Sequence, residues 1–220
     1  LAQSLAHGTL YVNRNVDEDD SVESYTGKIF ESAMASLDQV HHSLDMSAVN
    51  RAVDLLTQAK KIAFFGLGSS AAVAHDAMNK FFRFNVPVIY SDDIVLQRMS
   101  CMNCDDDDVV VIISHTGRTK SLVELAQLAR ENDAMVIALT SPGSPLAREA
   151  TLAITLDVPE DTDIYMPMVS RLAQLTVIDV LATGFTLRRG AKFRDNLKRV
   201  KEALKESRFD KEPFVPSDNQ

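Results

Sequence analysis

Tryptophan is absent from this 220-residue sequence, and cysteine occurs only twice. The two cysteines, Cys101 and Cys104, are too few for a disulfide framework. Two thiolates supply half of a tetrahedral zinc site, and no His or Cys pair stands at finger spacing elsewhere. The run Asp105–Asp108 lacks the alternating ligands and the glycine of a calcium loop. We therefore predict reduced cysteines, a solvated acidic loop, no metal and no cofactor.

Long apolar runs and an excess of basic charge are also missing. No stretch approaches the roughly 20 apolar residues that cross a bilayer, so we expect no membrane contact. The formal net charge is -8, whereas DNA-binding domains are usually basic. The chain by itself is therefore a poor candidate for holding a duplex. Its composition, 45% hydrophobic and 25% charged, predicts one cytoplasmic domain with a single core.

Short β-forming runs alternate with helical patterns along the middle of the chain. Val109–Ile113 has no polar break, which is typical of a strand buried on both faces in a parallel sheet. Strands are predicted at 61–65, 86–89, 109–113, 135–139 and 152–156. Helices are predicted at 22–44, 48–59, 70–83, 93–100, 119–132, 145–149, 166–187 and 191–207. This alternation predicts an α/β fold, a flavodoxin-like three-layer αβα sandwich around a five-stranded parallel sheet.

Hydroxyl-rich turns follow two of the predicted strands. The first reads Gly66-Leu67-Gly68-Ser69-Ser70, and the second reads Ser114-His115-Thr116-Gly117-Arg118-Thr119-Lys120-Ser121. Each leads into a helix, whose unpaired N–H groups and positive dipole end attract anions. Right-handed crossovers place both turns at the same edge of the sheet. Together the turns predict a site for one phosphate monoester.

Neither turn matches a nucleotide motif. Ala71 stands where the dinucleotide fingerprint needs its third glycine, and GxxxxGK[ST] is absent from both turns. For each turn alone, a tight turn with helix-capping hydroxyls is the alternative interpretation. His115 also leaves two interpretations open. Its ring contacts a ligand, or it is a loop residue whose backbone N–H matters more than its ring.

The two turns together resemble the pattern of the sugar isomerase (SIS) domain, GxGxS followed by SxSGxT. The likeness covers roughly residues 45–190 and continues in Val136–Thr140 and Ser170–Leu175. Among SIS proteins, the chain is similar to RpiR-type transcription regulators. Val12–Asn15 and Glu23–Ser32 favour the repressors of sugar catabolism within that group.

The resemblance implies a homodimeric effector domain that binds a phosphorylated sugar acid, 2-keto-3-deoxy-6-phosphogluconate, and releases DNA on binding it. Ser70 and Ser114 would be the main phosphate ligands, and a cation would meet the carboxylate end. The candidate cations are Arg83, Lys80, Arg171 and Lys120. The full set of expected ligand contacts is Gly68, Ser69, Ser70, Ser114, His115, Thr116, Gly117, Arg118, Thr119, Lys120, Arg83 and Arg171.

The resemblance also bears on catalysis. SIS isomerases carry a glutamate base on the helix after the first turn, and here Arg83 falls at that position. Asp76 is the remaining acid on the helix. A cation suits holding a carboxylate and does not abstract a proton. We therefore expect a sensor and no enzyme, with a phosphosugar isomerase or lyase as the alternative.

The expected organisation is one domain with loose ends. Residues 1–21 are expected to be a linker remnant, 22–208 the effector-binding domain, and 209–220 a tail. RpiR-type regulators carry a helix-turn-helix ahead of the SIS domain, so operator DNA would be reached only through that missing portion. The apolar run 172–181 fits a dimer interface or an internal core helix.

Overall fold

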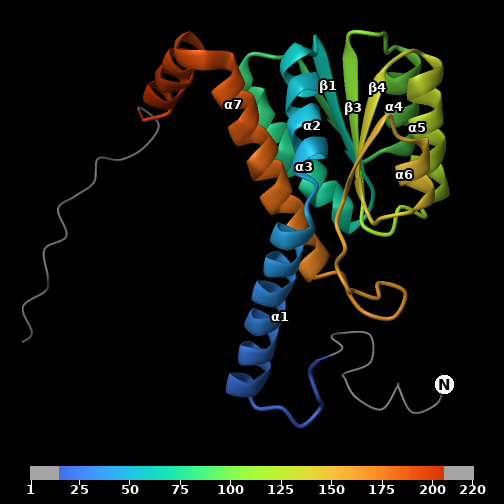
Figure 1. The fold of residues 1–220 in the computed structure, drawn as a ribbon, viewed down its shortest axis with the longest axis vertical. Coiled ribbons are helices and arrows are strands. Elements are labelled where there is room, and N and C mark those ends of the chain that lie inside the picture. The colour runs from blue at the N-terminus through green and yellow to red at the C-terminus, as the bar shows by residue number, and fades with distance from the viewer. Residues whose placement is uncertain (1–14, 206–220) are drawn as a thin grey trace, which may run out of the picture.

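The computed structural model describes residues 15–205, and at 192 and 196 the backbone alone (Figure 1). The expected linker therefore falls mostly, and the expected tail entirely, outside the described residues. Across 15–205, no helix combines the length and apolar character needed to cross a membrane.

Five parallel strands form the sheet, in the order β2-β1-β3-β4-β5. They are β1 (Lys61–Gly66), β2 (Val88–Ser91), β3 (Asp108–Ser114), β4 (Met135–Thr140) and β5 (Leu152–Thr155). The predicted strands and the predicted fold class are confirmed. The second strand begins two residues later than expected, because Pro87 has no N–H to donate to the ladder.

Helices cover both faces of the sheet, as Figure 1 shows. The helices are α1 (Val22–Ser43), α2 (Met46–Gln58), α3 (Ser69–Phe81), α4 (Ile94–Met102), α5 (Lys120–Glu131), α6 (Pro145–Glu149) and α7 (Val169–Ala203), with a 3-10 turn, η1 (Phe82–Phe84), after α3. One layer contains α2, α3 and α7, and the other contains α4, α5 and α6. The three layers match the predicted sandwich.

The central strands divide their side chains between two cores. Phe64 and Val111 pack toward α2, α3 and α7, whereas Phe65 and Ile112 pack toward α4, α5 and α6. All four side chains are at most 1% exposed. This two-sided burial explains why the sequence of β3 shows an unbroken apolar run.

Two of the differences from the predicted helix boundaries have a clear local cause. The α2 helix begins at Met46, because the Asp45 carboxylate accepts hydrogen bonds from the N–H groups of Ser47 and Ala48. The two predicted C-terminal helices run together as α7. Gly190, with φ 77° and ψ -167°, breaks the helical geometry between them.

The first helix is anchored near its C-terminal end. Ser36 and Val40 are its buried residues. The preceding turns reach past the edge of the sheet at which the strands end (Figure 1). Phe30 and Met34 on these turns remain 65% and 61% exposed.

Candidate functional site

The first hydroxyl turn joins β1 to α3 through two glycines. A β-carbon on Gly66 would lie 2.6 Å from the carbonyl oxygen of Ser70, so only glycine lets α3 start this close to the strand. Gly68 has φ 57°, which disfavours other residues. No side chain caps the start of α3. The N–H groups of Ser70 and Ala71 donate to the carbonyl oxygens of Leu67 and Gly68. The N–H of Ser69 and the two serine hydroxyls are therefore left to bind an external acceptor.

The second hydroxyl turn joins β3 to α5 and is held by its own side chains. The Ser114 hydroxyl accepts a hydrogen bond from the N–H of Gly117 at 3.2 Å. Thr116 Oγ1 accepts one from the N–H of Arg118 at 3.4 Å. Thr119 is the N-cap residue of α5, yet its hydroxyl makes no capping bond to that helix. Its oxygen is therefore not committed to the helix start.

Gly117 permits the tight packing beneath this turn. Its φ is 61°, and a β-carbon there would overlap Ser144 Oγ and Thr140 Oγ1. The hydroxyls of Thr140 and Ser144 lie 3.2 Å apart in a hydrogen bond. No larger residue fits between the turn and this pair.

The sheet brings the two turns side by side. Gly66 pairs with Ile113 in the β1–β3 register, so β1 ends one residue short of the level of Ser114. Adjacent strands lie about 4.8 Å apart. The order of the strands also reverses between β1 and β3, and open α/β sheets bind ligands at such a reversal. The topology therefore places the two turns next to each other, as predicted.

Two side chains of the second turn contact the segment between β5 and α7. His115 Nε2 lies 3.2 Å from the carbonyl oxygen of Glu160. The Arg118 guanidinium donates to both carboxylate oxygens of Asp163, at 2.7 and 2.6 Å, and this pairing raises the pKa of Arg118. We call residues 156–168 the connecting segment.

Glu160 of the connecting segment was not among the predicted site residues. Its carboxylate accepts hydrogen bonds from the N–H groups of Met168, Val169 and Ser170 and from the Ser170 hydroxyl. Burial raises the pKa of Glu160, but these donors outweigh burial and hold it below its ordinary value. The start of α7 thus already holds an anion from the chain itself. A cap from eight to ten residues away leaves no spacing signal in the sequence.

The four candidate cations lie in different places. Lys120 is the first residue of α5, and Arg171 lies in the first turn of α7. Both are exposed near the strand ends. Lys80 sits between the carboxylates of Asp76 and Asp179. These three remain candidates.

Arg83 lies far from the two turns of its own chain. It belongs to η1, beyond the C-terminal end of α3, and is exposed. The 13 residues from Ser70 span roughly 20 Å of helix. Because α3 runs antiparallel to the strands, Ser70 lies near the C-terminal ends of the strands and Arg83 near their N-terminal ends. The structure does not bring Arg83 to the site.

Comparisons with known proteins bear on the family and on the fold. A family model described as the SIS domain matches residues 55–184. The HTH-type transcriptional regulator HexR of Escherichia coli (strain K12) is 90% identical over 220 residues, covering 100% of this chain and 76% of the relative. HexR of Pseudomonas aeruginosa is 57% identical over 209 residues, covering 95% of this chain and 73% of that relative.

Solved structures share the fold. The NanR protein of Vibrio vulnificus, complexed with ManNAc-6P, superposes with a TM-score of 0.77 at 23% identity, covering 86% of this chain and 72% of that one. The sugar isomerase domain of an RpiR transcription factor from Sphaerobacter thermophilus gives a TM-score of 0.68 at 19% identity, covering 82% and 98%.

Proposed function

This chain belongs to the SIS-domain family and, within it, to the HexR-type transcriptional regulators, and from that membership we propose that it senses a phosphorylated sugar acid. The ligand we propose is 2-keto-3-deoxy-6-phosphogluconate. Binding relieves repression of genes for sugar catabolism, and operator DNA is held by a separate helix-turn-helix portion. The domain acts as a homodimer.

The observation that carries the proposal is the meeting of two hydroxyl turns at the strand-order reversal. The start of α3 has no side-chain cap, and the Thr119 hydroxyl makes no capping bond to α5. Backbone N–H groups and neutral hydroxyls there can surround a phosphate from two sides. The solved NanR complex contains a sugar phosphate, which supports this ligand class.

The carboxylate of the ligand needs a cation near the same edge. Lys120 and Arg171 are exposed at the starts of α5 and α7, and none of the described ion pairs involves either of them. Arg118 is nearby but is paired with Asp163. We therefore assign the carboxylate to Lys120 and Arg171.

A sensor fits the chemistry of the nearby acids better than an isomerase. The Glu160 carboxylate accepts four hydrogen bonds, and its lowered pKa makes it a weak base. Asp76 is paired with Lys80. Neither acid is poised to move a proton between sugar carbons. The alternative, an SIS isomerase, rests on relatives in structure such as a putative sugar-phosphate isomerase from Listeria monocytogenes.

Two measurements on the purified chain test the proposal. Titration calorimetry should show binding of 2-keto-3-deoxy-6-phosphogluconate and none of its unphosphorylated analogue. Incubation with ketose and aldose phosphates in deuterium oxide should show neither turnover nor exchange at carbon. Carbon exchange would establish the isomerase alternative, and equal binding of the unphosphorylated analogue would refute the phosphate site.

A further inference from the structure

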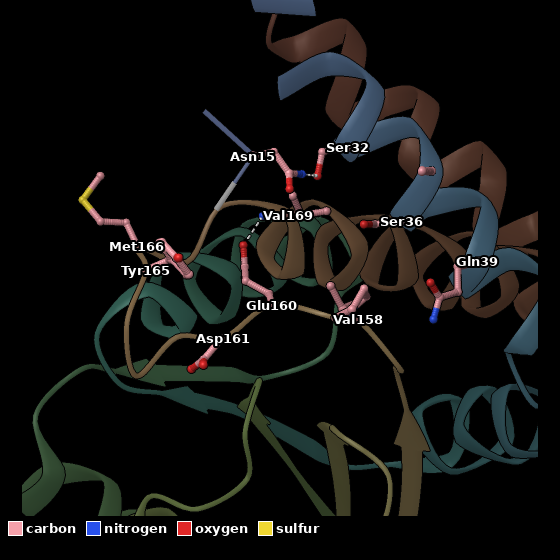
Figure 2. Close-up of a pocket in the computed structure, with 12 residues that line it drawn as sticks. Asn15, Ser32, Ser36, Gln39, Val158, Glu160, Asp161, Tyr165, Met166 and Val169 are labelled. Atoms are coloured by element: carbon pink, nitrogen blue, oxygen red, sulfur yellow. Dashed lines mark hydrogen bonds between the residues drawn. The ribbon is translucent and has the colours of Figure 1, made fainter. Parts of the chain in front are cut away.

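A cavity of about 370 Å³ lies between α1 and the connecting segment, outside the two hydroxyl turns. Figure 2 shows its residues, which come from α1 on one side and from residues 158–169 on the other, together with Asn15 from the segment before α1. Its size falls in the lower part of the range of small-molecule sites. The two walls are joined by a hydrogen bond from Gln39 Nε2 to the carbonyl oxygen of Asp157 at 3.0 Å.

Ser36 is a buried polar residue in this cavity. It is 8% exposed, and none of the described hydrogen bonds involves its hydroxyl. The hydroxyl oxygen is not among the buried polar atoms without a partner, so it faces the open cavity, where water or a ligand can reach it. The Ser36 side chain is among those drawn around the cavity in Figure 2. It is therefore a group that a small polar molecule in the cavity would satisfy.

The charges of the cavity exclude the proposed effector. No lysine or arginine lines it, and its ionisable acids are Glu160 and Asp161. A phosphate or a carboxylate placed here would meet like charge without a cation. Cations are not favoured either, because the Glu160 carboxylate is already compensated by the start of α7.

The remaining wall suits an uncharged molecule that carries hydroxyl groups. Ser32, Ser36 and Gln39 offer donors and acceptors from α1, and Tyr165 adds a phenol from the connecting segment. Val158 lies beneath them as an apolar floor. Small-molecule sites usually combine an apolar lining with a few polar groups.

We propose that this cavity is a second ligand site, for a small uncharged polyhydroxy compound such as an unphosphorylated sugar or sugar alcohol. The site is distinct from the two hydroxyl turns and holds its ligand through Ser36. A bound molecule bridges α1 and the connecting segment. Since His115 and Arg118 of the second turn contact that segment, occupancy of the two sites is thermodynamically coupled.

Ligand-observed NMR on the purified chain tests the site with sorbitol and D-glucose as probes. Saturation transfer to both probes at millimolar concentration is expected, with much less to gluconate, which adds a carboxylate to the same kind of polyol. Ser36→Ala should weaken binding roughly three- to tenfold. Ala35→Trp, at an exposed position of the cavity wall, should fill the cavity and abolish binding.

Ser43→Ala is the matched control, because Ser43 ends the same helix outside the cavity and should leave binding unchanged. Circular dichroism establishes that each variant is folded. Absence of transfer to either probe, or binding that survives Ala35→Trp, would overturn the proposal. Probe binding that is lost in Ser114→Ala and unchanged in Ser36→Ala would place the probe at the hydroxyl turns instead, which refutes a second site and leaves the proposed function standing.

Discussion

The N–H of Gly117 donates to the hydroxyl of Ser114 across 3.2 Å. Ser114, which we propose binds the phosphate, therefore also stabilises the turn in which it lies. Ser114 is therefore expected to contribute both to ligand affinity and to the stability of the turn. Ser70 is the second residue of the neighbouring helix α3, and none of the described hydrogen bonds involves its hydroxyl. The two serines can thus be separated by experiment.

Ser70→Ala and Ser114→Ala should each weaken binding of the phosphorylated sugar acid about ten- to a hundredfold, the usual worth of a hydrogen bond to a charged group. Ser114→Ala should also lower the free energy of unfolding by about 1 kcal/mol, because the Gly117 N–H loses its partner. Titration calorimetry and urea denaturation measure the two effects. Unchanged affinity in both variants would remove these serines from the site.

Gly117→Ala should destabilise the fold by about 2 kcal/mol or more, because its positive φ and its contacts with Thr140 and Ser144 leave no space for a methyl group. Gly27→Ala is the matched control. Gly27 lies within α1 with nothing near its absent β-carbon, so alanine there should stabilise the protein by roughly 0.5–1 kcal/mol. Thermal unfolding compares the pair, and equal melting temperatures would contradict the packing described for the second turn.

Glu160 should make the free energy of unfolding depend on pH in the acidic range. Its pKa in the folded protein lies below the ordinary value, so its contribution is present above that value and is lost as pH falls through the folded pKa. Wild-type protein should therefore lose stability below about pH 4.5 more steeply than Glu160→Gln. At neutral pH the variant should be the less stable protein. Denaturant unfolding at a series of pH values measures both, and parallel profiles would argue against the cap.

The effect of removing each candidate cation on ligand binding should depend on where it lies. Lys120→Ala and Arg171→Ala should each weaken binding of the sugar acid several-fold while leaving binding of a sugar phosphate that has no carboxylate nearly unchanged. Arg83→Ala should alter neither, because it lies at the opposite edge of the sheet. The comparison needs only calorimetry with two ligands. A large loss in Arg83→Ala would mean that the residue reaches a site from another copy of the chain.

The α7 helix offers a surface for the proposed homodimer. Leu172 and Val180 are 43% and 40% exposed on it, whereas Val177 and Leu181 are buried in the core. The apolar run 172–181 is thus partly a core helix, and its outer side remains available. Val180→Asp should shift sedimentation equilibrium from dimer to monomer. Val95→Asp, on an exposed face of α4, is the control that should leave the dimer intact.

Much of the fold follows from local pattern. The unbroken apolar run of β3 and the hydroxyl turn after it are readable because two-sided burial and helix starts impose their residue types locally. The helix break at Gly190 was also predicted to within a few residues. The late start of β2 was not predicted, although Pro87, which has no N–H for the ladder, stands directly before the strand in the sequence.

Only those parts of the candidate site that lie within short segments of the sequence were predictable. The two turns lie within short segments, and the parallel topology places them together. The distance of Arg83 depends on the direction of α3, and the contacts of Glu160 depend on how the connecting segment returns to α7. Such contacts between distant segments leave no period in the sequence, so residue type alone did not show that Arg83 lies away from the turns of its own chain, and it missed Glu160.

The reach of α1 makes this helix a lever. Its 22 residues extend about 33 Å, and its buried residues lie only in the last two turns. A tilt of roughly 5° about that base would move the far tip sideways by about 2 Å. Small rearrangements where the helix meets the body are thereby magnified at the beginning of the domain, without any change in the sheet.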